Sequence, residues 1–158
     1  MKTIILISAI WVFTIVGCDS SATEYGIAKI PIETSFNNEG MVYKLSLSQK
    51  TFNRTDTLYG KYTVTNQTGV TRRFEFANTQ QNGFRIYDST ESVVLFYPQI
   101  VSPALSSLEL QNGQTKEYLI FSTFKNYTGN YIKPNEYKFG AYLLNNNSPA
   151  IVLSISVQ

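Results

Sequence analysis

The stretch that decides the fold class runs Leu58-Tyr59-Gly60-Lys61-Tyr62-Thr63-Val64-Thr65-Asn66. Its apolar residues Leu58, Tyr62 and Val64 share one parity, and its lysine and threonines take the other. Alternation with a period of two gives a strand one buried face and one wetted face. After the turn at 67–69 the run 70–77 alternates in the same way, with Phe74 and Phe76 on one side. We therefore expect these two runs to pair as an antiparallel hairpin on one side of a β-sandwich.

Similar patterns recur to the end of the chain. Apolar residues alternate or run together at 41–47, 84–88, 93–97, 116–122, 137–143 and 151–157, and turn residues separate these segments. The run 93–97 is continuously apolar, which fits either a strand buried on both faces or a short edge strand. Eleven Tyr and ten Phe also favour strands over helices. We predict an all-β chain folded as an immunoglobulin-like antiparallel β-sandwich of about seven to nine strands.

The composition argues against several functional classes. The formal net charge is only +2, and no Lys/Arg run is longer than Arg72-Arg73, so nothing favours nucleic-acid binding. The chain has no His and one Cys, which excludes histidine-based catalytic triads, imidazole metal sites and an internal disulfide. Its carboxylates lie beside predicted turns or on the polar parity of strands. We expect neither a cofactor nor a metal, and a protein that is not an enzyme.

The N-terminal segment predicts the location of the protein. Lys2 precedes an apolar run over 4–16, which is shorter than the roughly 20 residues that span a bilayer. The run ends in Ile15-Val16-Gly17-Cys18, which resembles the lipobox of bacterial lipoproteins. The resemblance implies cleavage after Gly17 and lipidation of Cys18. Each buried acyl CH₂ contributes about 0.8 kcal/mol, so several chains anchor a protein stably. The alternatives are an uncleaved signal anchor and an ordinary secretory signal that contains a Cys.

This interpretation divides the chain into three segments: a lipoprotein signal peptide over 1–17, a lipidated N-terminus and tether over 18–40, and a sandwich domain over 41–158. The lipid on Cys18 is the expected membrane contact. It places the domain in the cell envelope, facing the periplasm or the exterior. Asp19 follows the lipobox, but it leaves the choice between inner and outer membrane open.

Two further local signals concern turns. The segment Lys133-Pro134-Asn135-Glu136-Tyr137 places a Tyr just after a turn and at the start of a late strand. In immunoglobulin-like sandwiches such a hydroxyl bonds back to nearby backbone and forms a tyrosine corner, although a hydroxyl that reaches water is the alternative. Asn-x-Ser/Thr tripeptides occur at Asn53, Asn66, Asn126 and Asn146, and they are typical of Asn-rich turns in this context.

A series of motifs carries a family resemblance over 41–144. The motifs are Tyr62-Thr63-Val64-Thr65-Asn66-Gln67-Thr68, Phe74-Glu75-Phe76, Gln81 with Gly83-Phe84-Arg85-Ile86-Tyr87-Asp88, Val93-Val94, Leu108-Glu109-Leu110-Gln111-Asn112-Gly113-Gln114-Thr115 and Pro134-Asn135-Glu136-Tyr137. In this order they are similar to the BsuPI-type domain of the bacterial intracellular proteinase inhibitor family. This chain departs from the family at Leu95-Phe96, where a Trp is usual, and at Asn135, where a Gly is usual. The resemblance implies a β-sandwich and inhibition of a serine proteinase, although the name-giving inhibitor acts inside the cell.

Two functions follow as expectations. The first is a membrane-anchored lipoprotein whose sandwich binds a protein, with proteinase inhibition as the activity. Loop residues are the expected contacts because strand residues are committed to the core or to ladders, and we select Gln80, Asn82, Tyr127 and Tyr131. The alternative is a structural or assembly lipoprotein of a cell-envelope complex. An inhibitor should present a rigid loop with an aromatic or basic tip, and an assembly protein a flat apolar patch or a free edge strand.

Overall fold

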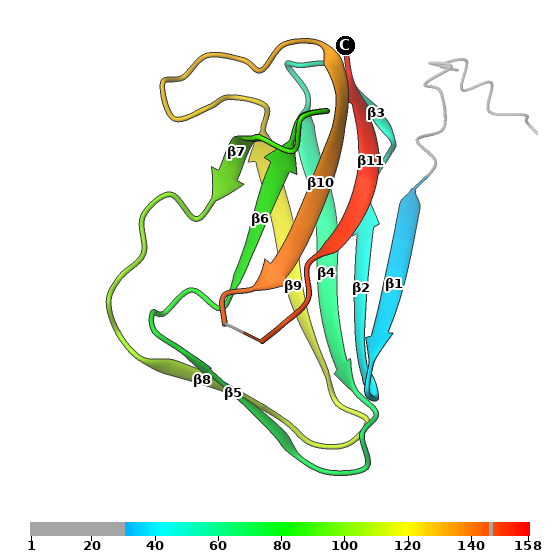
Figure 1. Cartoon of the computed structure of the whole chain (residues 1–158), viewed down its shortest axis with the longest axis vertical. Coiled ribbons are helices and arrows are strands. Elements are labelled where there is room, and N and C mark those ends of the chain that lie inside the picture. Colours follow the sequence, from blue (N-terminus) through cyan, green and yellow to red (C-terminus); the bar gives the residue numbers. More distant parts are fainter. Residues whose placement is uncertain (1–30, 146) are drawn as a thin grey trace, which may run out of the picture.

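A computed structural model of the chain describes residues 31–145 and 147–158, and it shows two β-sheets lying face to face (Figure 1). The predicted signal peptide, Cys18 and the tether up to Ile30 lie outside the described residues. In the part that is described, no helix is long and apolar enough to cross a membrane.

Eleven strands form in the described residues, more than the seven to nine expected. They are β1 (Ile32–Asn38), β2 (Met41–Leu47), β3 (Thr51–Phe52), β4 (Thr57–Asn66), β5 (Arg72–Phe76), β6 (Asn82–Tyr87), β7 (Val93–Tyr97), β8 (Ser106–Leu110), β9 (Thr115–Thr123), β10 (Asn135–Leu143) and β11 (Ile151–Val157). One sheet has the order β1-β2-β4-β9 and the other the order β3-β11-β10-β6-β7, while β5 and β8 form a separate ribbon. All pairings are antiparallel except that of the short β3 with β11, so the predicted all-β sandwich is confirmed.

The core lies between the two sheets, and the alternation predicted for 58–66 is confirmed. Leu58, Tyr62 and Val64 of β4 are fully buried, and they face Ile86 and Phe139 of the opposite sheet within one apolar cluster. Full burial of one such side chain contributes about 1.5–3 kcal/mol. The period-two pattern therefore identified the inner face of β4 correctly.

The predicted hairpin between 58–66 and 70–77 is wrong. β4 lies between β2 and β9, and β5 pairs with β8. The reason is Asn66, which is fully buried and donates from Nδ2 to the carbonyls of Val70 and Leu110, each at 2.7 Å. The chain therefore turns a corner at Asn66 instead of folding back. β5 and β8 continue the β4/β9 pair past this corner as a ribbon below the sheets (Figure 1).

The sandwich begins earlier than the sequence indicated. β1 pairs along its whole length with β2, so residues 32–38 belong to the sheet and not to the tether, and the expected start at 41 is too late. β1 is an edge strand, and only Ile32 and Thr34 of its side chains are partly buried. A strand that buries so little apolar surface carries no clear hydrophobic period, which explains why the pattern missed it.

Two open alternatives are settled by the pairing and by one hydrogen bond. The run 93–97 is the edge strand β7, which pairs only with β6 and buries only Leu95 fully. The Tyr137 hydroxyl donates to the carbonyl oxygen of Lys133 at 2.6 Å, so the tyrosine corner is present. It ties the start of β10 to the end of the preceding loop.

Candidate functional site

The loop 124–134 between β9 and β10 is held together by its own hydrogen bonds. Asn126 Oδ1 accepts from the Thr128 hydroxyl at 2.7 Å, from the Thr128 amide at 3.1 Å and from the Asn130 amide at 3.0 Å. Buried Phe124 and Ile132 fasten its two ends to the core, and the Ile132 amide donates to the Phe124 carbonyl at 2.8 Å. A loop fastened at both ends and bonded internally keeps one shape.

An aromatic side chain stands at the tip of this loop. Tyr127 is 79% exposed, and Tyr131 lies beneath the Lys125 ammonium, whose Nζ is 4.8 Å from the ring centroid. A bridge between Lys125 and Tyr131 closes the base of the tip. Two of the four predicted contact residues, Tyr127 and Tyr131, therefore lie close together on one rigid loop.

The other two predicted residues, Gln80 and Asn82, lie elsewhere, beside β9. Asn82 is the first residue of β6 and only 7% exposed, and it accepts a hydrogen bond from Gln80 Nε2 at 3.1 Å. Asn82 is thus not available as an exposed loop contact, because strand pairing with β10 buries it. Gln80 is half-buried, and with Asn82 it lines shallow grooves along β9.

An exposed apolar surface along β9 was missed by the sequence analysis. Leu119 and Phe121 are 71% and 73% exposed on the outer face of β9, and Tyr59 of β4 lies opposite Phe121. We call these three residues the β9 patch. β9 pairs with β4 alone among the described strands, so its other edge is free. The uninterrupted apolar run 118–121 was the available signal, because alternate residues of any strand must face outward.

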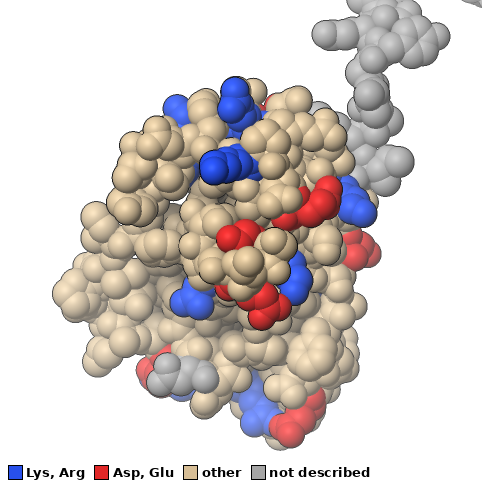
Figure 2. Space-filling model, turned by 45° about the horizontal axis from the view of Figure 1, so that its top comes forward, with Lys and Arg blue, Asp and Glu red and all other residues tan. Residues whose placement is uncertain are grey.

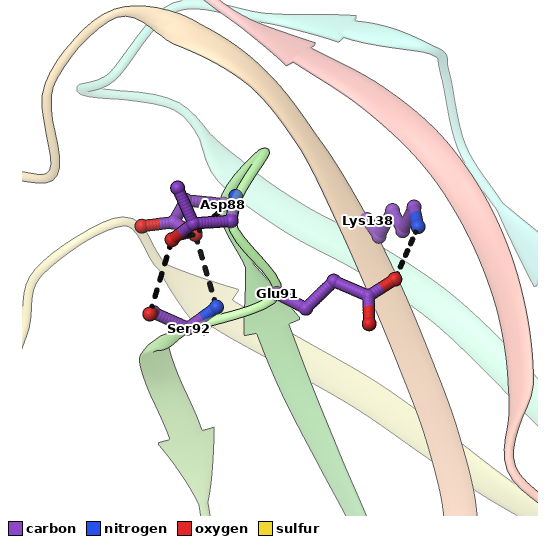
Figure 3. A network of polar contacts seen from close by, with 5 residues as sticks. Asp88, Glu91, Ser92 and Lys138 are labelled. Atoms are coloured by element: carbon purple, nitrogen blue, oxygen red, sulfur yellow. Dashed lines mark hydrogen bonds and ion pairs between the residues drawn. The ribbon is translucent and has the colours of Figure 1, made fainter.

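The turn between β6 and β7 carries a compact polar network (Figure 3). Asp88 Oδ1 accepts from the Thr90 hydroxyl at 2.7 Å, the Thr90 amide at 2.9 Å and the Ser92 amide at 3.0 Å. The hydrogen bond from the Thr90 side chain, followed by that from the Ser92 amide, holds the pKa of Asp88 below its ordinary value. The turn thereby places Glu91, whose φ is 62°, against Lys138 of β10, with 2.9 Å between carboxylate and ammonium.

Neither metal ligands nor surface charge mark a further site among the described residues. Within 31–145 and 147–158, no group of three His, Cys, Asp or Glu side chains could hold a metal ion. Figure 2 shows acidic and basic side chains close to one another over the middle of the face in view, basic side chains near its top and both signs at its lower edge. This face offers no large field of one sign to attract a polyanion.

Comparison with known proteins gives only distant structural similarities. The sequence matches no family profile and no curated protein. Among solved structures it is similar to a β-glucosidase from Listeria innocua (16% identity, TM-score 0.43, 77% of this chain and 17% of that chain). It is also similar to the CARDB domain of a Pyrococcus furiosus protein (12% identity, TM-score 0.41, 82% of this chain and 94% of that one). The chain thus spans about a sixth of the glucosidase.

Proposed function

We propose that this chain is a lipoprotein of the bacterial cell envelope whose β-sandwich binds another protein and inhibits a proteinase, without chemistry of its own. The observation that carries the proposal is the exposed Tyr127 on the hydrogen-bonded loop 124–134. A loop that is already ordered loses little conformational entropy on binding. A Tyr at its tip supplies contact area through few rotatable bonds.

The contacts at the corner support the resemblance to the BsuPI-type domain. Two of its motifs, 62–68 and 108–115, meet there. Asn66 Nδ2 donates to the Leu110 carbonyl, the Gly113 amide donates to the Asn66 carbonyl at 2.6 Å, and the Gly69 amide donates to Asn112 Oδ1 at 2.9 Å. The motifs therefore have a shared structural role in this chain, which is to build one corner.

The test of inhibition is a titration of the purified full-length protein in detergent against a panel of serine proteinases. We expect stoichiometric inhibition of at least one enzyme, and an increase in the inhibition constant of about tenfold or more for Tyr127→Ala. Tyr59→Ala is the matched control, because it removes an exposed Tyr from the β9 patch and leaves the loop intact. Rapid cleavage within 126–135 without inhibition would contradict the proposal.

The β9 patch favours a second candidate, an assembly lipoprotein whose free edge strand pairs with an envelope complex. An exposed edge with apolar side chains is a site for strand addition. In this case Leu119→Lys should abolish co-purification with the complex, whereas Tyr127→Ala should leave it unchanged. Co-purification that survives Leu119→Lys would rule out the β9 edge as the contact.

A further inference from the structure

The loop between β7 and β8 presents aliphatic side chains to solvent. Ile100 and Leu105 are 90% and 88% exposed, and Val101 is 43% exposed. We call residues 98–105 the apolar loop, and it arcs out beside the two sheets (Figure 1). Aliphatic surface is unfavourable in water, and several such side chains on one exposed segment mark a contact with a partner or with a membrane.

The end of β7 extends this surface. Phe96 and Tyr97 precede the apolar loop and are each 42% exposed. The sequence has no charged residue between Glu91 and Glu109, so the loop and β7 carry no charge. A Tyr beside aliphatic residues is typical of segments at the boundary between lipid and water, because its ring is apolar and its hydroxyl is polar. The composition therefore suits the interfacial region of a membrane.

Hydrogen bonds hold the closing end of the apolar loop against the segment that precedes β6. The Ser102 carbonyl accepts from the Ala104 amide at 2.8 Å and from the Thr79 amide at 3.4 Å. The Ser106 hydroxyl donates to the Asn78 carbonyl at 2.7 Å. The exposed aliphatic side chains are therefore presented by a loop whose end is fastened to the domain.

The backbone of the apolar loop has few donors that would lose water on entering lipid. A backbone N–H without a partner is unfavourable in hydrocarbon. Pro98 and Pro103 have no N–H, and the Ala104 amide is already bonded within the loop. Insertion only to the boundary between headgroups and acyl chains, about 5–10 Å deep, leaves the remaining polar groups in reach of water.

The predicted lipid anchor favours a membrane over a protein partner, and this step rests on the proposed lipoprotein. Residues 19–31 connect Cys18 to the start of β1, and an extended chain of that length covers roughly 45 Å. The apolar loop lies on the side of the sandwich opposite β1 (Figure 1). A sheet of four or five strands is about 15–20 Å wide, so the tether is long enough for this side to face the membrane. Tethering also gives the loop a high effective concentration at the lipid surface.

We infer that the apolar loop inserts Ile100, Val101 and Leu105 into the interfacial region of the membrane that carries the anchor. The loop is then a second membrane contact besides Cys18, and two contacts fix how the sandwich is oriented on the bilayer. The loop shares no residue with loop 124–134 or with the β9 patch. It does not depend on proteinase inhibition.

The experiment places one Trp at a time in the mature lipoprotein, reconstituted in vesicles of phosphatidylethanolamine and phosphatidylglycerol. Trp11 is the only Trp of the chain and lies in the predicted signal peptide, so the mature wild-type protein serves as the blank. The emission of Ile100→Trp should shift to shorter wavelength, and brominated acyl chains should quench it about twofold or more. Phe36→Trp, 48% exposed on β1 at the opposite side of the sandwich, should emit as in water and stay unquenched.

Two added charges separate insertion from folding. Leu105→Lys in the Ile100→Trp protein should remove most of the quenching, because a charged side chain is costly in lipid, whereas Leu119→Lys on β9 should not. Both should leave the thermal midpoint unchanged, because both side chains are exposed. Flotation with the vesicles reports the anchor separately, and wild-type protein that does not float would contradict the anchor and the insertion together. Floating protein in which Ile100→Trp stays unquenched, or in which Phe36→Trp is quenched equally, would overturn the insertion alone.

Discussion

Three short turns in this protein are held by the same pair of side-chain hydrogen bonds. Asn66, Asp88 and Asn126 are each followed two positions later by a Thr, and in each case the side-chain Oδ1 accepts from both the amide and the hydroxyl of that Thr. The hydroxyl contacts are all 2.7 Å long. A side chain that bonds to backbone two residues ahead makes a turn without help from distant parts of the chain. The surroundings then differ, because Asn66 is fully buried whereas Asp88 and Asn126 lie near the surface.

This difference predicts unequal costs for the same substitution. Asn66→Ala leaves the Leu110 carbonyl without this buried donor, and an unsatisfied buried group costs about 1–3 kcal/mol, whereas the Val70 carbonyl still accepts from the Thr68 hydroxyl. Asn126→Ala breaks exposed contacts only, and water can replace them. We expect a clearly lower urea midpoint for Asn66→Ala than for Asn126→Ala. Equal midpoints would show that the corner does not depend on the Asn66 amide.

The β5/β8 ribbon is the element that departs most from a simple sandwich. It packs on the core through one side only, since Phe76 is almost fully buried and Phe74, on the same parity, is half-buried. Arg73 and Glu75 point away and remain exposed. The ribbon is thus fastened at the Phe76 end of β5, and at the other end Leu110 of β8, opposite Arg72, is buried as well.

A pair of alanine substitutions tests the difference in burial between Phe74 and Phe76. Phe76→Ala should lower the free energy of unfolding by about 3–5 kcal/mol, because it leaves a cavity in the core. Phe74→Ala should cost clearly less, because part of its ring is already in contact with solvent. Equilibrium denaturation of the two variants gives both values. A larger loss for Phe74→Ala would show that the ribbon packs in a different register.

Two tyrosines that are buried on folding should make the stability of the whole sandwich depend on pH under alkaline conditions. Burial raises the pKa of Tyr118 to about 12 from an ordinary value of 10.0, and burial also raises the pKa of Tyr62. A pKa raised by folding favours the neutral folded form, so this stability is complete below pH 10 and is lost as the pH rises through the folded pKa. We expect the unfolding midpoint to decrease as the pH is raised from about 10 to about 12. In Tyr118→Phe this decrease with pH should be less steep. A midpoint that stays flat over this range would contradict the burial of these phenols.

The expected lipid anchor is also tested on the whole molecule. Cys18 closes the predicted lipobox and lies outside the described residues. Cys18→Ser removes the thiol that would carry diacylglycerol, so the protein should leave the membrane fraction or remain unprocessed. Fractionation and mass measurement of the N-terminus report both outcomes. A variant that is cleaved and anchored as before would show that the lipobox interpretation is wrong.

What the sequence determined by itself is local. The alternation at 58–66 identified the buried face of β4, the turn before Tyr137 gave the tyrosine corner as one of two alternatives, and turn residues were expected between 84–88 and 93–97. Each of these depends on residues within a few positions of one another. A period of two places a side chain on a face whichever strand lies alongside.

Only the tertiary structure decided which strands pair and what their outer faces carry. β4 pairs with β9, fifty or more residues away along the chain, and the buried Asn66 amide at the end of β4 bonds to the carbonyls of Val70 and Leu110. The β9 patch likewise brings together side chains from different strands. Strand pairing reflects burial and hydrogen bonding shared by distant segments, and the same alternation is compatible with several partners. The corner and the patch therefore became visible only in the folded chain.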